Sequence, residues 1–485
     1  MPGVIVTTAV RTGPVNVQTA ATATMFVAGV TERGPDGTDN AFLVTSIADY
    51  EDIFGGYTSS GYVHQTVETF FEEGGARAYV SRVVPSDATE ATCALQFDGD
   101  AVITLTSAGK GTWSHGGVLT ASVVQSGGQF KIQIKLNGTL VYSTKYHSTT
   151  LNAVDEINNS SAASVWVTAQ DEGELVIPDE VTNQNFVSGT NGTSVTDNDV
   201  IAAVACFNQN MGPGAVCVPG YTSSAIRLAV MAHAEDNNRI AILGFDKDAT
   251  VNDVISDATD YTDIAGQSER TAFFHPWVKI PNGTITMTIP PDGYVCGQRA
   301  AIHNQYGSWS PYAGERSESK FVVAPVTALT KSDADALDAG YVNAIKLFNG
   351  KARIYGARSV SSDTDNFRFI IAREVLNQIV NEAENALEAM LFLPIDGRKS
   401  TFSKVQASLT AIMDRIQKGG GLYEAFDANG KQIDPGYVVQ VNDALNPVSQ
   451  LATGVIKAKV GARVASVGDR IEVTITKSNL TTTLV

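Results

Sequence analysis

Three residue types that together can cleave a peptide bond occur in a suggestive order along the chain. Asp98, His115 and Ser194 follow the Asp, His, Ser order that one class of serine proteases uses. In such enzymes the serine opens a helix, whereas the residues from Ser194 onward, "SVTDND", favour a turn first. Asp98 and His115 also lie in a β-rich region that differs in pattern from the segment after Ser194, and a triad must be built on one rigid site. The pattern therefore argues against proteolysis.

Glycine-rich turns raise a second possibility, a phosphate site. The stretch "FFEEGGARAYVSRVV", residues 70–84, places a glycine pair between an apolar helix and a strand. A phosphate loop needs the reverse order, because the free amides of a helix N-terminus hold the phosphate. We therefore expect Gly74 or Gly75 to end a helix in the left-handed conformation, before a strand near Ala78. The Gly-Lys pairs lack the rest of a P-loop, and zincin and esterase motifs are absent from the sequence.

Two further features are candidates for metal binding. His275 lies in the aromatic strand "FFHPW", where a lone histidine is more often a hydrogen-bonded core residue than a ligand. Asp333 and Asp335 in "KSDADALD" have the alternating spacing of a calcium loop, but the glycine and the distal glutamate of such a loop are missing. An acidic first turn of a helix explains them better. We therefore predict no catalytic residues, no metal site and no cofactor.

The composition is that of a multidomain globular protein. The 485 residues exceed what one core accommodates, so we expect about three domains. The net charge of −17 argues against nucleic-acid binding and favours either solubility or a basic partner surface. No apolar run approaches the ~18 residues that span a bilayer, and the start "MPGVIVTTAVRTG" carries no recognisable secretion signal, so we expect no membrane insertion and folding in a cytoplasm. Four cysteines far apart in the sequence predict buried free thiols: Cys93, Cys206, Cys217 and Cys296.

The pattern of apolar residues divides the chain into segments. Residues 24–85 mix short strands and helices. Residues 86–192 are short alternating strands with glycine turns, which predicts an inserted β-sandwich. In residues 193–355 strands alternate with helices, which predicts a parallel sheet covered on both faces. Residues 356–470 hold two amphipathic helices followed by strands.

The first of these amphipathic helices is expected from about Phe367 to Phe392, before Pro394, and the second ends at the glycines 419–421. The polar side of the first helix is expected to be solvated, with contact to a partner as the alternative. That side carries Arg373, Glu374, Glu382, Glu384 and Glu388.

Three ordered blocks of sequence, taken with this plan, resemble one protein family. The first block reads "MPGVIVTTAV", "TATMFVAGVTERGP", "VTSIADYEDIFGGY" and "FFEEGGARAYVSRVV". The second is "IPPDGYVCGQRAAIHNQYGSWSPYAGE", and the third is "ARIYGARSVSSDTDNFRFIIAREVLNQI". Together they resemble contractile tail sheath proteins of tailed bacteriophages and related contractile injection systems, over nearly the whole chain. Tyr355 departs from the pattern, since the family usually has tryptophan there.

The resemblance implies a fold class of α/β and α+β multidomain type. Residues 193–355 would form a subtilisin-like parallel βαβ domain without protease activity, and residues 86–192 an inserted β-sandwich domain. An α+β core domain would be built from the N- and C-terminal parts of the chain, residues 24–85 and 356–470. The subunit would polymerise helically around an inner tube and contract to drive the tube through a target cell envelope.

The resemblance also implies partners and connecting arms. The partners would be copies of the same chain, the inner tail tube protein, and baseplate and tail terminator proteins, in a virion tail assembled in the host cytoplasm. Extended arms, residues 1–23 and 471–485, would add strands to a neighbouring subunit, since free strand edges suit a polymer. The arm strands would contain Val4, Ile5, Val6, Ile471, Val473 and Ile475.

Two alternatives stay open at the level of the sequence. Free edges and a β-rich insert also suit another self-assembling shell or a surface-layer protein. A subtilisin-like hydrolase on the parallel sheet, acting through Asp98, His115 and Ser194, is the enzymatic alternative.

Overall fold

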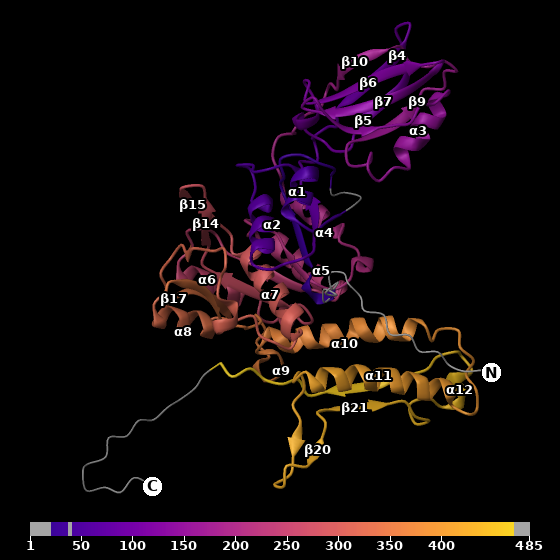
Figure 1. Cartoon of the computed structure of the whole chain (residues 1–485). Helices are drawn as coiled ribbons and strands as arrows, with labels where there is room; N and C mark the ends of the chain where they lie inside the picture. The colour runs from indigo at the N-terminus through magenta and orange to yellow at the C-terminus, as the bar shows by residue number, and fades with distance from the viewer. Residues whose placement is uncertain (1–20, 37–40, 470–485) are drawn as a thin grey trace, which may run out of the picture.

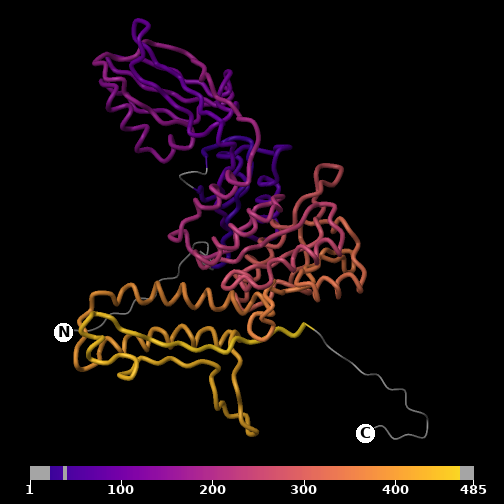
Figure 2. Tube along the Cα trace, turned by 180° about the vertical axis from the view of Figure 1, so that it is seen from behind, coloured from indigo at the N-terminus to yellow at the C-terminus, as the bar shows by residue number. Residues whose placement is uncertain are grey.

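A computed structural model describes residues 21–36 and 41–469 of the chain. These residues form three parts, which we call the insert (residues 86–192), the sheet body (residues 21–85 and 193–360) and the C-terminal body (residues 364–469). Figures 1 and 2 show the insert and the C-terminal body on opposite sides of the sheet body.

The sheet body is built on an eight-stranded sheet in the order β18-β17-β13-β12-β11-β1-β3-β2. Neighbouring strands from β17 to β3 run parallel, while β18 and β2 close the two edges in the antiparallel sense. The strands are β1 (Met25–Gly29), β2 (Phe42–Val44), β3 (Ala78–Arg82), β11 (Ala215–Cys217), β12 (Ile240–Leu243), β13 (Thr271–His275), β17 (Val342–Phe348) and β18 (Lys351–Tyr355).

Helices cover both faces of this sheet. One face packs against α1 (Ile47–Phe54), α2 (Val63–Glu72) and α7 (Asp292–Tyr306), and the other against α4 (Asp197–Ala205), α5 (Ser224–Asp236), α6 (Val251–Thr259) and α8 (Lys331–Ala339). Strand β1 shows why, because Met25 and Val27 belong to one core, whereas Phe26 and Ala28 belong to the other. A strand buried on both faces needs apolar side chains at successive positions. The predicted parallel sheet is confirmed.

The domain plan drawn from the sequence is wrong in one respect. Residues 24–85 were expected to form a core domain with residues 356–470, separate from residues 193–355. Instead β1 pairs directly with β11, so the first and third segments share one sheet. The reason is visible in "MFVAG", since an unbroken apolar run is typical of a central parallel strand.

Helices α2 and α7 touch along their backbones. A Cβ atom at Gly293 would lie 2.4 Å from the carbonyl oxygen of Thr66, and one at Gly297 would lie 2.8 Å from that of Phe70. Only glycine permits such an approach. Helix α2 then ends near Gly74, whose φ of 109° is left-handed, and β3 begins at Ala78. The helix, glycine and strand order predicted for this stretch is therefore confirmed.

The insert consists of two antiparallel sheets and helix α3 (Thr150–Asn158), which share one apolar core. The sheets are β10-β6-β7-β8 and β4-β5-β9, formed by β4 (Thr92–Phe97), β5 (Asp100–Ser107), β6 (Leu119–Ser126), β7 (Gln129–Leu136), β8 (Thr139–Ser143), β9 (Val167–Asp171) and β10 (Val181–Asn185). The chain enters and leaves the insert side by side, since Thr89 and Thr190 exchange backbone hydrogen bonds of 3.1 and 3.2 Å. Helix α3 was not expected from the sequence.

The C-terminal body contains the two expected long helices, α10 (Ile370–Glu388) and α11 (Ser400–Lys418), which lie side by side in both views. The smaller elements are α9 (Thr364–Phe367), α12 (Val448–Leu451) and the strand pairs β19 (Ala425–Phe426) with β20 (Gln432–Asp434) and β21 (Tyr437–Gln440) with β22 (Lys459–Ala462). A further small sheet of the sheet body joins β14 (Val278–Asn282), β15 (Ile285–Ile289) and β16 (Ala324–Pro325). None of the helices described has the length and apolar character needed to cross a bilayer.

Candidate assembly surfaces

The carboxyl ends of parallel strands, where the strand order reverses, are the usual ligand site of such a sheet. Here the reversal lies between β1 and β11, and protein side chains fill the place. A Cβ atom at Gly29 would lie 2.6 Å from Val63, and one at Gly220 would lie 2.7 Å from the ring of Tyr62. The Tyr62 ring also packs edge-on against Trp277, with 5.2 Å between the ring centroids. This crevice therefore contributes to the core rather than to a binding site.

The residues of the possible triad lie in separate turns. Asp98 occupies the turn between β4 and β5, where its backbone N–H donates to Asp179 over 3.0 Å. His115 Nδ1 lies 3.0 Å from the carbonyl oxygen of Gly189, and Ser194 is exposed in the loop before α4. Within residues 21–36 and 41–469, no hydrogen bond or ion pair joins these three side chains. The arrangement gives no support to a nucleophilic serine.

The other chemical candidates have structural explanations. His275 is buried in β13 beside the ring of Phe245, and burial lowers its pKa to about 4, so it is a neutral core residue at pH 7. Its Nδ1 has no hydrogen-bond partner in the described structure, whereas a hydrogen-bonded histidine was expected.

Asp333 accepts hydrogen bonds from the backbone N–H and hydroxyl of Thr330 in a capping box, as expected for a helix start. Within the described residues no disulfide joins the cysteines, of which Cys93, Cys217 and Cys296 are buried and Cys206 is half-buried.

A buried carboxyl group gives the sheet body a pH-dependent stability. Asp292 begins α7, and burial raises the pKa of its carboxyl from 3.8 to about 7. The folded state therefore holds this proton more tightly than the unfolded state. Its contribution to the free energy of unfolding falls as the pH rises from about 4 to about 7, by at most about 1.4 kcal/mol per pH unit, and then levels off.

We expect Asp292→Asn to remove this dependence and to be more stable than the parent protein at pH 8. Urea unfolding at pH 5 and pH 8 measures the difference, with the exposed Asp248→Asn as control. Identical changes of stability between the two pH values for the parent and Asp292→Asn would contradict this assignment.

The C-terminal body is fixed to the sheet body by a buried ion pair. Arg299 of α7 donates to both carboxylate oxygens of Glu374 of α10, over 2.6 and 2.7 Å, and each side chain is 1 % exposed. Burial alone would lower the pKa of Arg299, but the charge and hydrogen bonds of Glu374 raise it. Arg299 also donates to the carbonyl oxygen of Thr22. The expectation that Glu374 lies on a solvated side of its helix is wrong.

Of the other four charged residues on the polar side of α10, two form ion pairs and two are exposed to solvent. Arg373 pairs with Glu269 over 3.3 Å, and Glu382 pairs with Arg415 of α11. Only Glu384 and Glu388 of the five residues are exposed. The solvated face of α10 is thus limited to its outer half.

A tryptophan forms a second contact between the two bodies. Trp309 follows α7 and packs against the glycines that end α11, since a Cβ atom at Gly419 would lie 2.1 Å from its ring. The amide of Asn377 donates to the carbonyl oxygen of Arg239, and Asn238 donates to that of Asn377. The sequence pattern around Trp309 did not predict this role.

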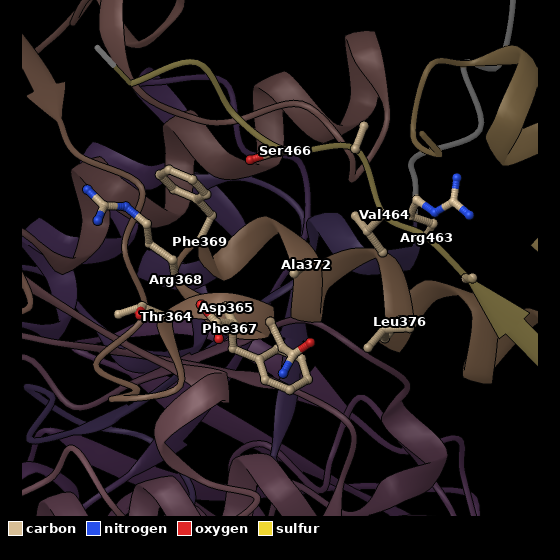
Figure 3. A pocket seen from close by; sticks show the side chains of 13 residues that line it. Thr364, Asp365, Phe367, Arg368, Phe369, Ala372, Leu376, Arg463, Val464 and Ser466 are labelled. Atoms are coloured by element: carbon tan, nitrogen blue, oxygen red, sulfur yellow. The ribbon is translucent and has the colours of Figure 1, made fainter. Parts of the chain in front are cut away.

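The sheet of β21 and β22 is the candidate acceptor for arms. In the described part of the chain each of these strands pairs with one neighbour only, so each offers one unpaired edge. Beside it lies a groove of about 580 Å³, lined by residues 364–369, Ala372, Leu376 and residues 462–466 (Figure 3). Asp469, where the described chain ends, is held near this groove by an ion pair with Arg368 over 2.8 Å. The expected arm residues, from Val4 to Val6 and from Ile471 to Ile475, lie outside the described residues.

Comparison with solved structures places this architecture among known ones. No protein-family model and no curated protein matches the sequence. The sheath tail protein Lin1278 from Listeria innocua gives a TM-score of 0.60 at 13 % identity, over 87 % of this chain and 89 % of that chain. The sheath of an extracellular contractile injection system, PVC, in the contracted state gives 0.57 at 16 % identity, over 99 % and 98 %.

The contracted helical sheath of the anti-feeding prophage gives a TM-score of 0.55 at 15 % identity, over 99 % of both chains. The chain therefore has the fold of contractile sheath proteins over nearly its whole length. The resemblance seen in the sequence is confirmed at the level of the fold.

Proposed function

We propose that this chain is the structural subunit of a contractile sheath, which polymerises helically around an inner tube and contracts to drive the tube through a target cell envelope. The observation that carries the proposal is the shared fold, which covers 99 % of this chain and 99 % of the anti-feeding prophage sheath subunit. The matched proteins are structural sheath components rather than enzymes. The filled crevice and the separated triad residues agree with a structural role.

Helical assembly needs a head-to-tail contact that does not close on itself. We assign this contact to the arms, residues 1–23 and 471–485, whose strands carry Val4, Ile5, Val6, Ile471, Val473 and Ile475. Strand addition is favourable where an edge is unpaired, and the edges of β21 and β22 supply such positions beside the groove of Figure 3.

The proposed partners follow from this role. They are copies of the same chain, the inner tail tube protein, and baseplate and tail terminator proteins. The PVC neighbour belongs to an extracellular contractile injection system, and another matched chain belongs to the anti-feeding prophage baseplate. We place this chain in the tail of such a particle, as part of a virion or an injection system assembled in the host cytoplasm.

The subtilisin-like and β-sandwich descriptions of the individual domains are part of the same proposal. The parallel sheet flanked by helices supports a subtilisin-like topology for residues 193–355, extended by β1, β2 and β3. Two sheets around one core support the name β-sandwich for the insert. During contraction, we propose that subunits leave a kinetically trapped extended lattice by rotating as rigid bodies while the arms keep them connected.

Removal of residues 1–10 or of residues 471–485 is expected to leave a folded subunit that forms no long tubes. The reason is that each truncation removes the strands that tie one subunit to the next. Negative-stain microscopy measures tube length, and circular dichroism with thermal melting checks the fold. Tubes of normal length from either truncation would contradict the assignment of the arms.

Val473→Lys tests the assignment of the arms more finely than truncation, because it places one charge within the predicted arm strand. Ser478→Lys is the matched control, because it places the same charge outside that strand.

Hollow tubes with helical striations from the parent chain support a sheath. Flat sheets would instead support a surface layer, and discrete particles would reopen the hydrolase alternative.

A further inference from the structure

The insert has an apolar core of its own and projects from the sheet body at one end (Figures 1 and 2). The buried apolar side chains of this core all come from the insert itself, so the core does not extend into the sheet body. Domains that share no large apolar interface are expected to move relative to each other. The orientation of the insert therefore depends on the polar contacts at the end where it joins the sheet body.

A buried arginine of the sheet body reaches a loop of the insert. Arg82 ends β3 and is 6 % exposed. Its Nη1 lies 2.9 Å from the carbonyl oxygen of Gly34, 2.9 Å from Oδ1 of Asp36 and 2.8 Å from the carbonyl oxygen of Lys110. Gly34 and Asp36 belong to the loop after β1, whereas Lys110 belongs to the loop after β5 of the insert. One guanidinium group therefore joins two parts of the molecule.

Further contacts hold the insert loop at the same place. The backbone N–H of Lys110 donates to Oδ1 of Asp36 over 3.1 Å. A Cβ atom at Gly109 would lie 2.1 Å from the carbonyl oxygen of Gly34, so only glycine permits this approach of the two backbones. Within the insert, the indole N–H of Trp113 donates to the carbonyl oxygen of Lys110 over 3.0 Å. We give the name clasp to the residues that meet across the two parts: Gly34, Asp36, Arg82, Gly109 and Lys110.

A charged group is an unfavourable choice for a buried contact unless its direction matters. Burial lowers the pKa of Arg82 to about 10, so the guanidinium remains charged at pH 7. Apolar side chains of similar volume often fill such a space with equal or greater stability. Hydrogen bonds from a planar guanidinium are directional, so they specify where the acceptor oxygens of both loops lie.

We infer that the clasp holds the insert in one orientation, and that opening the clasp lets the insert turn about its two ends while both parts stay folded. The inference goes beyond the proposed function and does not depend on it, because it concerns the single subunit. Under the proposed function, a closed clasp would give every copy of the chain in a helical polymer the same outline.

Cleavage by trypsin after Lys110 measures the opening of the clasp. The carbonyl oxygen of Lys110 belongs to the bond that trypsin cuts, and it accepts hydrogen bonds from Arg82 and Trp113. We expect Arg82→Met in the full-length chain to raise the rate of this cut about tenfold or more, because the open state becomes more populated. Arg77→Met is the matched control, since Arg77 directly precedes β3 and donates to Thr24 instead, and it should be cut at the rate of the parent.

A double variant separates the clasp from a general support of the fold. Asp36→Leu with Arg82→Met replaces the buried ion pair by apolar side chains, so the melting temperature should return toward that of the parent. The hydrogen bonds from Arg82 to Gly34 and Lys110 stay absent in this variant. We therefore expect the bond after Lys110 to be cut as fast as in Arg82→Met.

A distance measurement tests the orientation directly. Nitroxide labels are attached at Ser59→Cys of the sheet body and Ser126→Cys of the insert, both exposed positions. Cys206→Ser removes the one native cysteine that is not buried. Electron–electron double resonance should give a broader distribution of distances after Arg82→Met than in the same labelled chain with Arg82.

Each other outcome has a defined meaning. Cleavage after Lys110 at the rate of the parent overturns the inference, and so does an equally narrow distribution of distances, since other contacts would then orient the insert. If Arg82→Met is cut throughout the chain because it does not fold, the double variant decides. A stable double variant that is cut after Lys110 as slowly as the parent also overturns the inference.

Discussion

Glu374→Ala is expected to lower the free energy of unfolding by about 3–5 kcal/mol, the largest effect of any single substitution considered. The variant leaves the Arg299 guanidinium 1 % exposed and without the carboxylate that accepts its two hydrogen bonds. An unpaired buried charge costs far more than the net contribution of the pair. Chemical unfolding followed by tryptophan fluorescence measures the loss, because Trp309 lies in the same joint.

Two variants separate this explanation from a general sensitivity of α10. Glu384→Ala removes an exposed charge from the same helix and should change stability by less than about 0.5 kcal/mol. The double variant Arg299→Met with Glu374→Leu replaces the pair by apolar side chains and should recover much of the loss. A double variant as unstable as Glu374→Ala would show that the unpaired charge is not the cause.

Glu73→Gln is expected to cost about 3 kcal/mol, although it changes a single atom of the side chain. Glu73 is fully buried at the end of α2, and its Oε1 accepts hydrogen bonds from the hydroxyl of Ser319 and the backbone N–H groups of Phe321 and Val322. Its Oε2 accepts from the side chain of Gln298 and the N–H of Lys320. Glutamine would turn one acceptor into a donor that faces other donors.

Glu72→Gln is the matched control for this prediction, because Glu72 precedes Glu73 in the sequence and is exposed. Thermal melting of the two variants beside the parent protein gives the comparison. Similar melting temperatures for Glu73→Gln and Glu72→Gln would show that the loop of residues 319–322 does not depend on this carboxylate.

These two carboxylates show how far local sequence reasoning reaches. The order of helix, glycine and strand in residues 70–84 could be predicted, because each step depends on neighbouring residues. Glu73 lies three positions after the buried Phe70, so helical spacing placed it on the apolar face, and this signal went unused. Glu374 likewise lies three positions after the buried Ile371 of α10. Its partner Arg299 is 75 positions away, a distance over which sequence patterns carry no pairing information.

The same limit explains the error in the domain plan. The helix, glycine and strand of residues 70–84 were recognisable from their own residues, but the pairing of β1 with β11 joins segments separated by the whole insert. Periodicity assigns an element, whereas the choice of its neighbours depends on the packing of the complete sheet.

The two ends of the insert lie close together, and this has a consequence for how the insert can vary. Thr89 and Thr190 are joined by backbone hydrogen bonds, and the carboxylate of Asp87 accepts a hydrogen bond from the backbone N–H of Thr193. The two ends of a segment of about a hundred residues therefore lie side by side. A module joined in this way adds no length between β3 and α4, the elements that flank it. The insert can therefore be exchanged, enlarged or deleted without a change in the distance between these two elements. Under the proposed function, the insert could therefore change in size or charge without any change in the sheet body to which it is joined.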